Sequence, residues 1–192
     1  MSSERMEKLD RLLAQVLAQV DGCPASMARD ALQFIAADFC RYTGVWQVEL
    51  VEPVAAGEHQ VVLAGIPKGA RLGAVLAVRL GGMSLTRTEY SVGVEDIVLH
   101  EAPCRDTELA ALVTLRPERT TQFLPESIME EWGDIMAFGA LAKLKTMSGA
   151  NVAWTDPQGA QVNLTLYNEG IGAARTRAYR RRRGGGALFA NA

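Results

Sequence analysis

Two histidines, His59 and His100, are the candidates for a general base in this chain. Nucleophilic catalysis needs a Ser or Cys that such a base activates, and a third group that orients the base. His59 lies in an expected turn, His100 follows an expected strand, and the nucleophile motif G-x-S-x-G is absent from the sequence. We therefore predict that neither histidine is catalytic and that the chain is not an enzyme.

Carboxylates occur as neighbours at three places, but neighbouring acids on one strand or helix usually face water. Glycoside hydrolysis instead needs two carboxyls on opposite sides of a sugar. The pairs are Glu95 with Asp96, Asp106 with Glu108, and Glu130 with Glu131. A cell-wall hydrolase that uses Asp106, Glu130, Glu131 and His100 is the weakest of the alternatives.

The sequence offers no metal or cofactor site. The cysteines Cys23, Cys40 and Cys104 are far apart and no C-x-x-C occurs, whereas a zinc site needs four close nitrogen or sulfur ligands. We expect three reduced thiols, with Cys40 buried on a helix. The glycines of 65–69 lack the spacing of a phosphate-binding loop.

The strongest chemical signal is a basic segment near the end of the chain. Six arginines between positions 175 and 183 carry +6 in a chain of net charge −2, so the remainder carries −8. Such a segment can neutralise nucleic-acid phosphates, or its guanidinium groups can pair with carboxylates of an acidic protein surface. A solvated tail is the third alternative. The arginines are Arg175, Arg177, Arg180, Arg181, Arg182 and Arg183.

An apolar tip follows these arginines and favours a protein socket over nucleic acid. Gly184–Gly186 should end the preceding helix and act as a hinge. We expect this arm to become ordered only on assembly. The predicted partner-binding residues are Arg180, Arg181, Arg182, Arg183, Leu188 and Phe189.

The elements that must position this arm are helices at both ends of the chain. Apolar residues recur every three or four positions, which predicts helices over 4–20, 24–43, 125–147 and 156–180. Gly44 should cap the second helix, Pro125 should be the first residue of the third, and Thr155 or Asp156 should cap the fourth. The stripe of the last helix is the most regular in the chain. It consists of Ala160, Leu164, Tyr167, Ile171, Ala174 and Ala178.

Between these helices the chain has the pattern of antiparallel strands joined by turns. Short alternating or β-branched runs occur at 46–51, 60–63, 74–80, 94–99 and 109–116, and Gly81-Gly82 should form a hairpin turn. We predict a helix-dominated α+β fold. Its N- and C-terminal helices form a four-helix bundle with a central antiparallel β insertion and an extended C-terminal arm. The predicted parts are 1–45, 46–118, 119–180 and 181–192.

Length and hydropathy fit this assignment. The chain of 192 residues is long enough for one core with appendages. It has no apolar run long enough to cross a membrane, and its first residues lack the apolar core of a signal peptide. We expect the protein to fold in a cytoplasm.

Several segments together resemble the head-to-tail connector (adaptor) proteins of tailed bacteriophages, in particular the short-tailed type. The first is the amphipathic segment 27–46, with Phe39-Cys40 and Trp46. The others are Leu124-Pro125-Glu126 before a helix that contains 139–144, and Trp154-Thr155-Asp156-Pro157 before a helix that contains 171–175. The resemblance covers roughly residues 25–46 and 120–180, and its motifs are structural rather than catalytic.

The resemblance implies a structural virion protein that is assembled in the host cytoplasm. Such adaptors form a ring, usually of twelve copies, between the portal protein and the tail nozzle or tail tube. Genomic DNA passes through the ring without sequence-specific binding, and the C-terminal extension docks on the portal. The alternative from the residues themselves is a nucleic-acid-binding assembly protein that uses the arginine segment.

Overall fold

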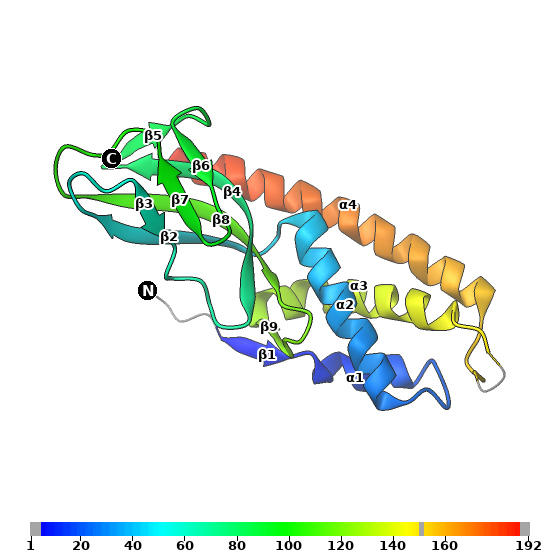
Figure 1. Cartoon of the computed structure of the whole chain (residues 1–192). Helices are drawn as coiled ribbons and strands as arrows, with labels where there is room; N and C mark the ends of the chain where they lie inside the picture. Colours follow the sequence, from blue (N-terminus) through cyan, green and yellow to red (C-terminus); the bar gives the residue numbers. More distant parts are fainter. Residues whose placement is uncertain (1–4, 150–151, 189–192) are drawn as a thin grey trace. The chain divides into compact units, whose positions relative to one another are not determined.

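The computed structural model describes residues 5–149 and 152–188, and of residues 183–188 it describes the backbone alone. The chain divides into two compact units (Figure 1). One unit combines Met1–Val45 with Pro117–Ala192, and the other is Trp46–Arg116. The first unit is therefore built from two segments that are far apart in the sequence.

Over the residues that the structure describes, the first unit contains four helices, and both α2 and α3 contact the other three. Its core includes the fully buried side chains of Phe39, Met136 and Leu141. The ring of Phe39 lies 5.9 Å from that of Trp132 and 6.3 Å from that of Tyr167, measured between centroids. The helices are α1 (Asp10–Leu17), α2 (Ala25–Thr43), α3 (Glu126–Lys145) and α4 (Pro157–Leu188).

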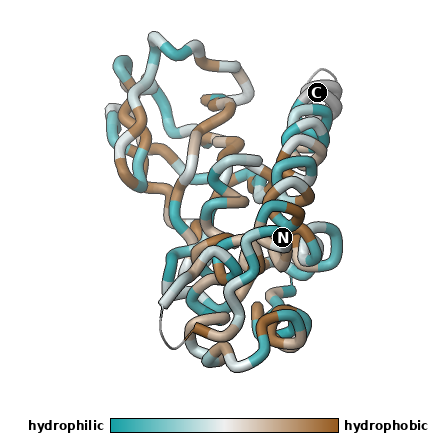
Figure 2. The backbone as a smooth tube through the Cα atoms, turned by 90° about the vertical axis from the view of Figure 1, so that its right-hand side faces the viewer, coloured by the Kyte–Doolittle hydropathy of each residue, from teal (hydrophilic) through white to brown (hydrophobic). Residues whose placement is uncertain are grey.

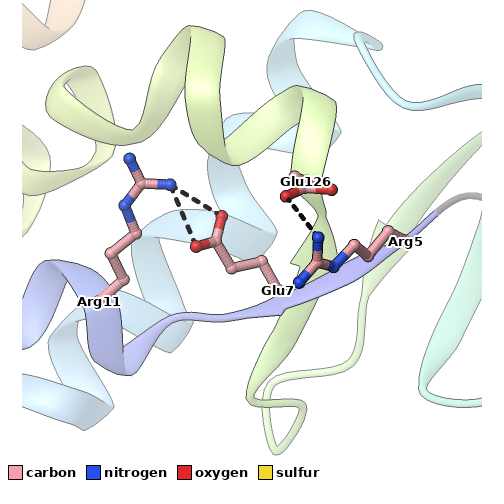
Figure 3. Close-up of polar contacts among 4 residues, drawn as sticks. All are labelled: Arg5, Glu7, Arg11 and Glu126. Carbon is pink, nitrogen blue, oxygen red and sulfur yellow. Dashed lines mark hydrogen bonds and ion pairs between the residues drawn. The ribbon is translucent and has the colours of Figure 1, made fainter.

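A two-stranded antiparallel sheet joins the start of the chain to the start of α3. It consists of β1 (Met6–Lys8) and β9 (Phe123–Pro125). The backbone oxygen of Arg5 accepts a hydrogen bond of 2.8 Å from the backbone N–H of Glu126, the first residue of α3. The guanidinium of Arg5 also lies 3.6 Å from the Glu126 carboxylate (Figure 3). The residue before β1 thus satisfies a backbone donor that the helix itself cannot satisfy.

The ends of two helices are set by local residues. α2 ends at Gly44, which has a φ of 63° and donates its N–H to the Cys40 oxygen at 2.9 Å, so the predicted cap is confirmed. Pro125 has an extended ψ of 134° and precedes α3. The prediction that Pro125 is the first helical residue is therefore wrong by one position.

The second unit consists of two antiparallel sheets. One has the strand order β2-β8-β4-β5, and the other has the order β3-β7-β6. Gly81 and Gly82, with φ of 56° and 84°, form the predicted tight turn between β4 and β5. The strands are β2 (Gln47–Val54), β3 (Gln60–Val62), β4 (Ala70–Leu80), β5 (Met83–Leu85), β6 (Tyr90–Val92), β7 (Asp96–Leu99) and β8 (Thr107–Pro117).

The second unit begins and ends on neighbouring strands. β2 pairs with β8 from Gln47 opposite Thr114 to Val54 opposite Thr107. The N–H of Leu115 donates to the oxygen of Trp46 at 2.8 Å. One face of β8 is fully buried, because side chains alternate between the two faces of a strand. Its buried side chains are those of Leu109, Ala111, Val113 and Leu115.

The predicted fold class is wrong. The structure is an α+β fold with four helices and three antiparallel sheets, rather than a helix-dominated four-helix bundle with a single central insertion. One of the three sheets, β1 with β9, lies within the helical unit. Its formation depends on pairing between segments more than a hundred residues apart, which the local helical period of the sequence cannot show.

Two consequences of that prediction also need correction. The first expected helix, 4–20, is shorter, because Met6–Lys8 pair as a strand and the helix begins at Asp10. The expected extended arm after position 180 is helical as far as Leu188. Glycine in a helix costs only about 1 kcal/mol relative to alanine, so Gly184–Gly186 weaken this helix without ending it.

Candidate docking site on the last helix

The start of α4 is fixed by Asp156, one of the two predicted caps. Its Oδ1 accepts a hydrogen bond of 2.8 Å from the N–H of Gly159, and its Oδ2 accepts one of 3.1 Å from the Lys145 ammonium. The hydrogen bond from the Gly159 N–H lowers the pKa of this carboxyl below its ordinary value, and the hydrogen bond from Lys145 makes a smaller contribution in the same direction. Thr155, the other predicted cap, donates its hydroxyl to the Met147 oxygen instead.

One narrow stripe of α4 is buried. The buried residues recur every three or four positions, so they lie on a single side of the helix. Small residues in the stripe permit close contact: at Gly170, for example, an added Cβ would lie 2.3 Å from the Cγ2 atom of Ile135. Asn163, the polar member of the stripe, donates its amide to the Gly159 oxygen at 2.7 Å. The stripe consists of Ala160, Asn163, Tyr167, Gly170, Ala174 and Ala178.

The opposite side of α4 is exposed and nearly uncharged. Between Pro157 and Ala174 the only charged residue is Glu169. Val162 and Leu166, one turn apart, are 60% and 37% exposed. Hydrophobic and hydrophilic residues accordingly alternate along this helix (Figure 2). We call this side the outward face of α4 and define it by Val162, Leu166, Gly172, Ala173, Thr176 and Arg180.

An exposed helix face with few charges has the composition of a protein interface. Charged residues are depleted at the core of such interfaces, and Arg is enriched in them. Four of the residues that define the face line an open hollow on the helix surface together with Arg177: Gly172, Ala173, Thr176 and Arg180. The outward face therefore offers a shallow surface to another macromolecule.

The arginines of α4 fall into two groups. Arg175 donates to the backbone oxygen of Tyr42 at 2.8 Å, and Arg177 lies 2.7 Å from the Glu131 carboxylate, so both fasten the helix to its own unit. Arg180 and Arg181 are exposed and make no hydrogen bond or ion pair to any described residue. Charge at this end of the helix is thus available to a partner.

The structure covers only part of the predicted binding set. Arg180, Arg181 and Arg182 are exposed on α4, in its helical part rather than on a separate arm. Arg183 and Leu188 lie in the part of α4 whose backbone alone is described, and Phe189 lies outside the described residues. The outward face was missed, although its signal, one charge in eighteen residues of a helix, is visible in the sequence.

A cavity of about 50 Å³ lies between the first half of α3 and the end of α4. It is lined by Ser127, Glu131 and Trp132 from α3 and by Arg177 and Arg181 from α4, among others. This volume holds a few water molecules, whereas sites for small molecules usually measure roughly 300–1,000 Å³. The cavity therefore does not compete with the outward face as a binding site.

The predicted non-catalytic histidines both bond to backbone oxygens. Nδ1 of His59 lies 2.9 Å from the Leu99 oxygen, and Nδ1 of His100 lies 2.8 Å from the Thr88 oxygen. Nε2 of His100 lies 3.1 Å from the Ser91 hydroxyl, a serine–histidine contact that the sequence did not predict. Ser91 and His100 are both exposed, so nothing around this pair keeps water away from a reaction.

Three of the acids considered for hydrolysis make structural contacts. Asp96 accepts a hydrogen bond from the Gln60 amide at 2.6 Å, and Asp106 accepts one from the Ala56 N–H at 2.9 Å. Glu131 forms its ion pair with Arg177. These three carboxylates hold a turn, two strands and two helices together.

The thiols and acids do not gather into a metal site. Cys23 and Cys40 are buried free thiols, as expected for Cys40, and Cys104 is an exposed one. Burial raises the pKa of Cys40 to about 12, so its reactive thiolate form is rare at neutral pH. Within 5–149 and 152–188, no three potential ligands come close enough to hold a metal ion. The helices described are also too short or too polar to cross a bilayer.

The chain matches no protein-family model and no curated protein sequence.

Proposed function

We propose that this protein is a head-to-tail adaptor of a short-tailed bacteriophage. Copies of the chain form a ring, of twelve subunits in the adaptors it resembles, between the portal and the tail nozzle or tube. Genomic DNA passes through the lumen of this ring. The protein acts as a structural part of the virion and catalyses no reaction.

The observation that supports a structural role best is the outward face of α4. A soluble helix that exposes Val162 and Leu166 yet carries a single charge over five turns requires a partner surface. The helix then ends in arginines, of which Arg180 and Arg181 bind no described residue. One side of α4 packs against its own unit and the opposite side is exposed, which is the arrangement expected for a subunit that binds other subunits.

The end of α4 is the proposed portal contact. Guanidinium groups recognise carboxylates through two parallel hydrogen bonds, which provides orientation as well as affinity. An acidic portal surface would bind the arginine segment, and the apolar residues beyond it would fill a pocket. The segment consists of Arg181, Arg182 and Arg183, followed by Leu188 and Phe189. Arg180, the remaining member of the predicted set, belongs to the outward face of α4.

The net charge of the remaining chain fits a DNA channel. Without its six C-terminal arginines the protein carries a net charge of −8. A wall of the same sign as DNA repels it, so the genome can slide without adhering. In this proposal the arginines bind protein and do not face the lumen.

Deletion of residues 184–192 tests the portal contact. We expect a folded subunit with an unchanged helical signal that no longer joins particles containing the portal protein from the same genome. The matched control replaces Gly184–Gly186 by three alanines, which keeps the arginines and the apolar tip and favours the helix. Electron micrographs of purified protein with portal measure attachment. Normal attachment of the truncated subunit would refute the docking role.

Nucleic-acid binding is the second candidate, because Arg180 and Arg181 also suit phosphates. Filter binding to duplex DNA at several salt concentrations separates the two. Binding through several arginines loses affinity steeply between about 50 and 200 mM salt. Tight, salt-dependent binding that the truncation 184–192 leaves intact but Arg180→Ala with Arg181→Ala abolishes would favour this candidate.

A further inference from the structure

We infer that the outward face of α4 binds a second copy of this chain, at the acidic row of α3 formed by Glu126, Glu130 and Asp134. Glu130 and Asp134 are exposed, and Glu126 is half-buried. The inference rests on the proposed ring and names the surfaces through which its subunits join. Three observations support it: an unexplained glycine, complementary charges, and the difference between the two surfaces.

The glycines of the helices identify the place of contact. Of the five helical glycines whose surroundings are described, four have a reason within the chain, because an added Cβ would meet a neighbouring side chain. At Gly133 the Cβ would lie 3.1 Å from Leu12, and at Gly139 it would lie 2.7 Å from Ile35. At Gly172 it would meet nothing within 4 Å. Glycine weakens a helix, so the open position at Gly172 indicates close approach of a surface outside this chain.

The surroundings of Gly172 agree with a helix as the occupant. Gly172, Ala173 and Thr176 have small side chains and line the hollow on the outward face. Small residues let two helix backbones come close and gain dispersion contacts along their length. Val162 and Leu166 continue the face toward the start of α4 and add apolar area.

Charge selects a copy of this chain as the partner. Arg180 lies at the end of the outward face and is exposed, without a bond to any described residue. On α3, Glu126, Glu130 and Asp134 follow at intervals of four residues, so like charges stand one above another and repel. Glu126 has Arg5 nearby and Asp134 accepts from Gln15, whereas Glu130 is exposed and bonds to no described residue.

The two surfaces differ, and this determines the kind of assembly. Contact between the outward face of α4 and the acidic row of α3 joins unlike patches, so each copy keeps one free surface of each kind. Such heterologous contacts continue from copy to copy until they close into a ring or extend as a filament. A symmetric pairing of two α4 helices would stop at a dimer.

The first experiment blocks the outward face of α4 with a large side chain. Full-length chains are compared by sedimentation velocity over a range of concentrations. Gly172→Trp should raise the concentration needed for association at least about tenfold, which corresponds to about 1.4 kcal/mol. Val94→Trp is the control, because Val94 is 86% exposed and lies in the other unit. Circular dichroism checks that Gly172→Trp keeps the helices.

The second experiment tests the charge pair. Arg180→Glu and Glu130→Arg should each weaken association by a similar factor, and the double variant should recover most of it. A merely structural effect of either change would not be reversed by the other. Recovered association in the double variant would show that Arg180 pairs with Glu130. Additive losses of association would overturn this pairing.

Other results overturn the inference. They include wild-type protein that stays monomeric at every concentration, association that Gly172→Trp leaves unchanged, and a dimer that forms no larger species. The proposed function is tested separately by attachment to portal. Association through this face without portal attachment would refute the adaptor while the interface stands. If the protein attaches to portal but Gly172→Trp does not change its self-association, the interface is refuted and the adaptor function stands.

Discussion

Asp156 connects the end of α3 to the start of α4 through a single carboxylate. One oxygen accepts the N–H of Gly159 in the first turn of α4, and the other accepts from Lys145 in the last turn of α3. The first contact needs only an oxygen acceptor, whereas the second also benefits from negative charge. These two contributions can be separated by an amide.

Asp156→Asn should therefore change how stability depends on pH more than it changes the fold. The pKa of Asp156 is lower in the folded than in the unfolded chain, where it is near 3.8. Its charge thus stabilises the folded state above that pH, and this stabilisation is lost as pH falls through the lower, folded value. Asparagine still caps a helix but has no charge to lose.

We expect the Asn variant to have a somewhat lower Tm than the wild type at pH 7 and a smaller difference at pH 2.5. Thermal unfolding followed by circular dichroism at both values measures this. Asp30→Asn, at another exposed acid, serves as the control. A Tm difference that stays constant between the two pH values would contradict the role of the charge.

At this scale the sequence predicted caps well, because capping depends on a few adjacent residues. Asp156 and Gly44 could be recognised from their types and from the periodic residues beside them. The arginines could be recognised as well. The sequence could not show which arginines remain available to a partner. The contacts of Arg175 with Tyr42 and of Arg177 with Glu131 depend on how α4 packs against α2 and α3.

Among the elements, α3 and α4 contain glycines in opposite environments. Gly139 faces α2 and α4, where an added Cβ would lie 2.7 Å from Ile35 and 2.9 Å from Tyr167. Gly172 faces open space. The same substitution at the two positions should therefore have effects of opposite sign.

Gly139→Ala should destabilise the chain by about 1–3 kcal/mol, because overfilling a packed contact forces its neighbours apart. Gly172→Ala should stabilise it by about 0.5–1 kcal/mol, because alanine favours the helix and fits without contact. Urea unfolding of dilute protein measures both free energies. Losses of equal size at the two positions would contradict the packing described for Gly139.

The elements that the sequence predicted closely are those with their own local signals. α2 lies between Pro24 and Gly44 and differs from its predicted range by one residue. β1 was missed because its partner, β9, lies more than a hundred residues away. β5 and β6 have three residues each and were also missed, whereas β3, of the same length, lies in the apolar run predicted at 60–63.

For the whole molecule, the predicted fold class was wrong because long-range strand pairing overrides the local helical period of one segment. Residues 4–20 have a helical period, yet their first part is a strand because β9 offers it backbone partners. The prediction assumed that the parts of the chain on both sides of the β insertion contain helices alone. The structure shows instead that the helical unit contains a sheet of its own, which connects the start of the chain to α3.

The second unit should fold without the first. It begins and ends on paired strands, with the Leu115 N–H bonded to the Trp46 oxygen at 2.8 Å, so excision of Trp46–Arg116 cuts the chain at two adjacent points. Domains of this size often fold alone. We expect this fragment to give a strand-type circular dichroism spectrum and a cooperative melt. The complementary chain, with Val45 joined to Pro117 by a short Gly-Ser linker, should keep its helical spectrum. If both pieces are unfolded, the two units depend on each other for stability.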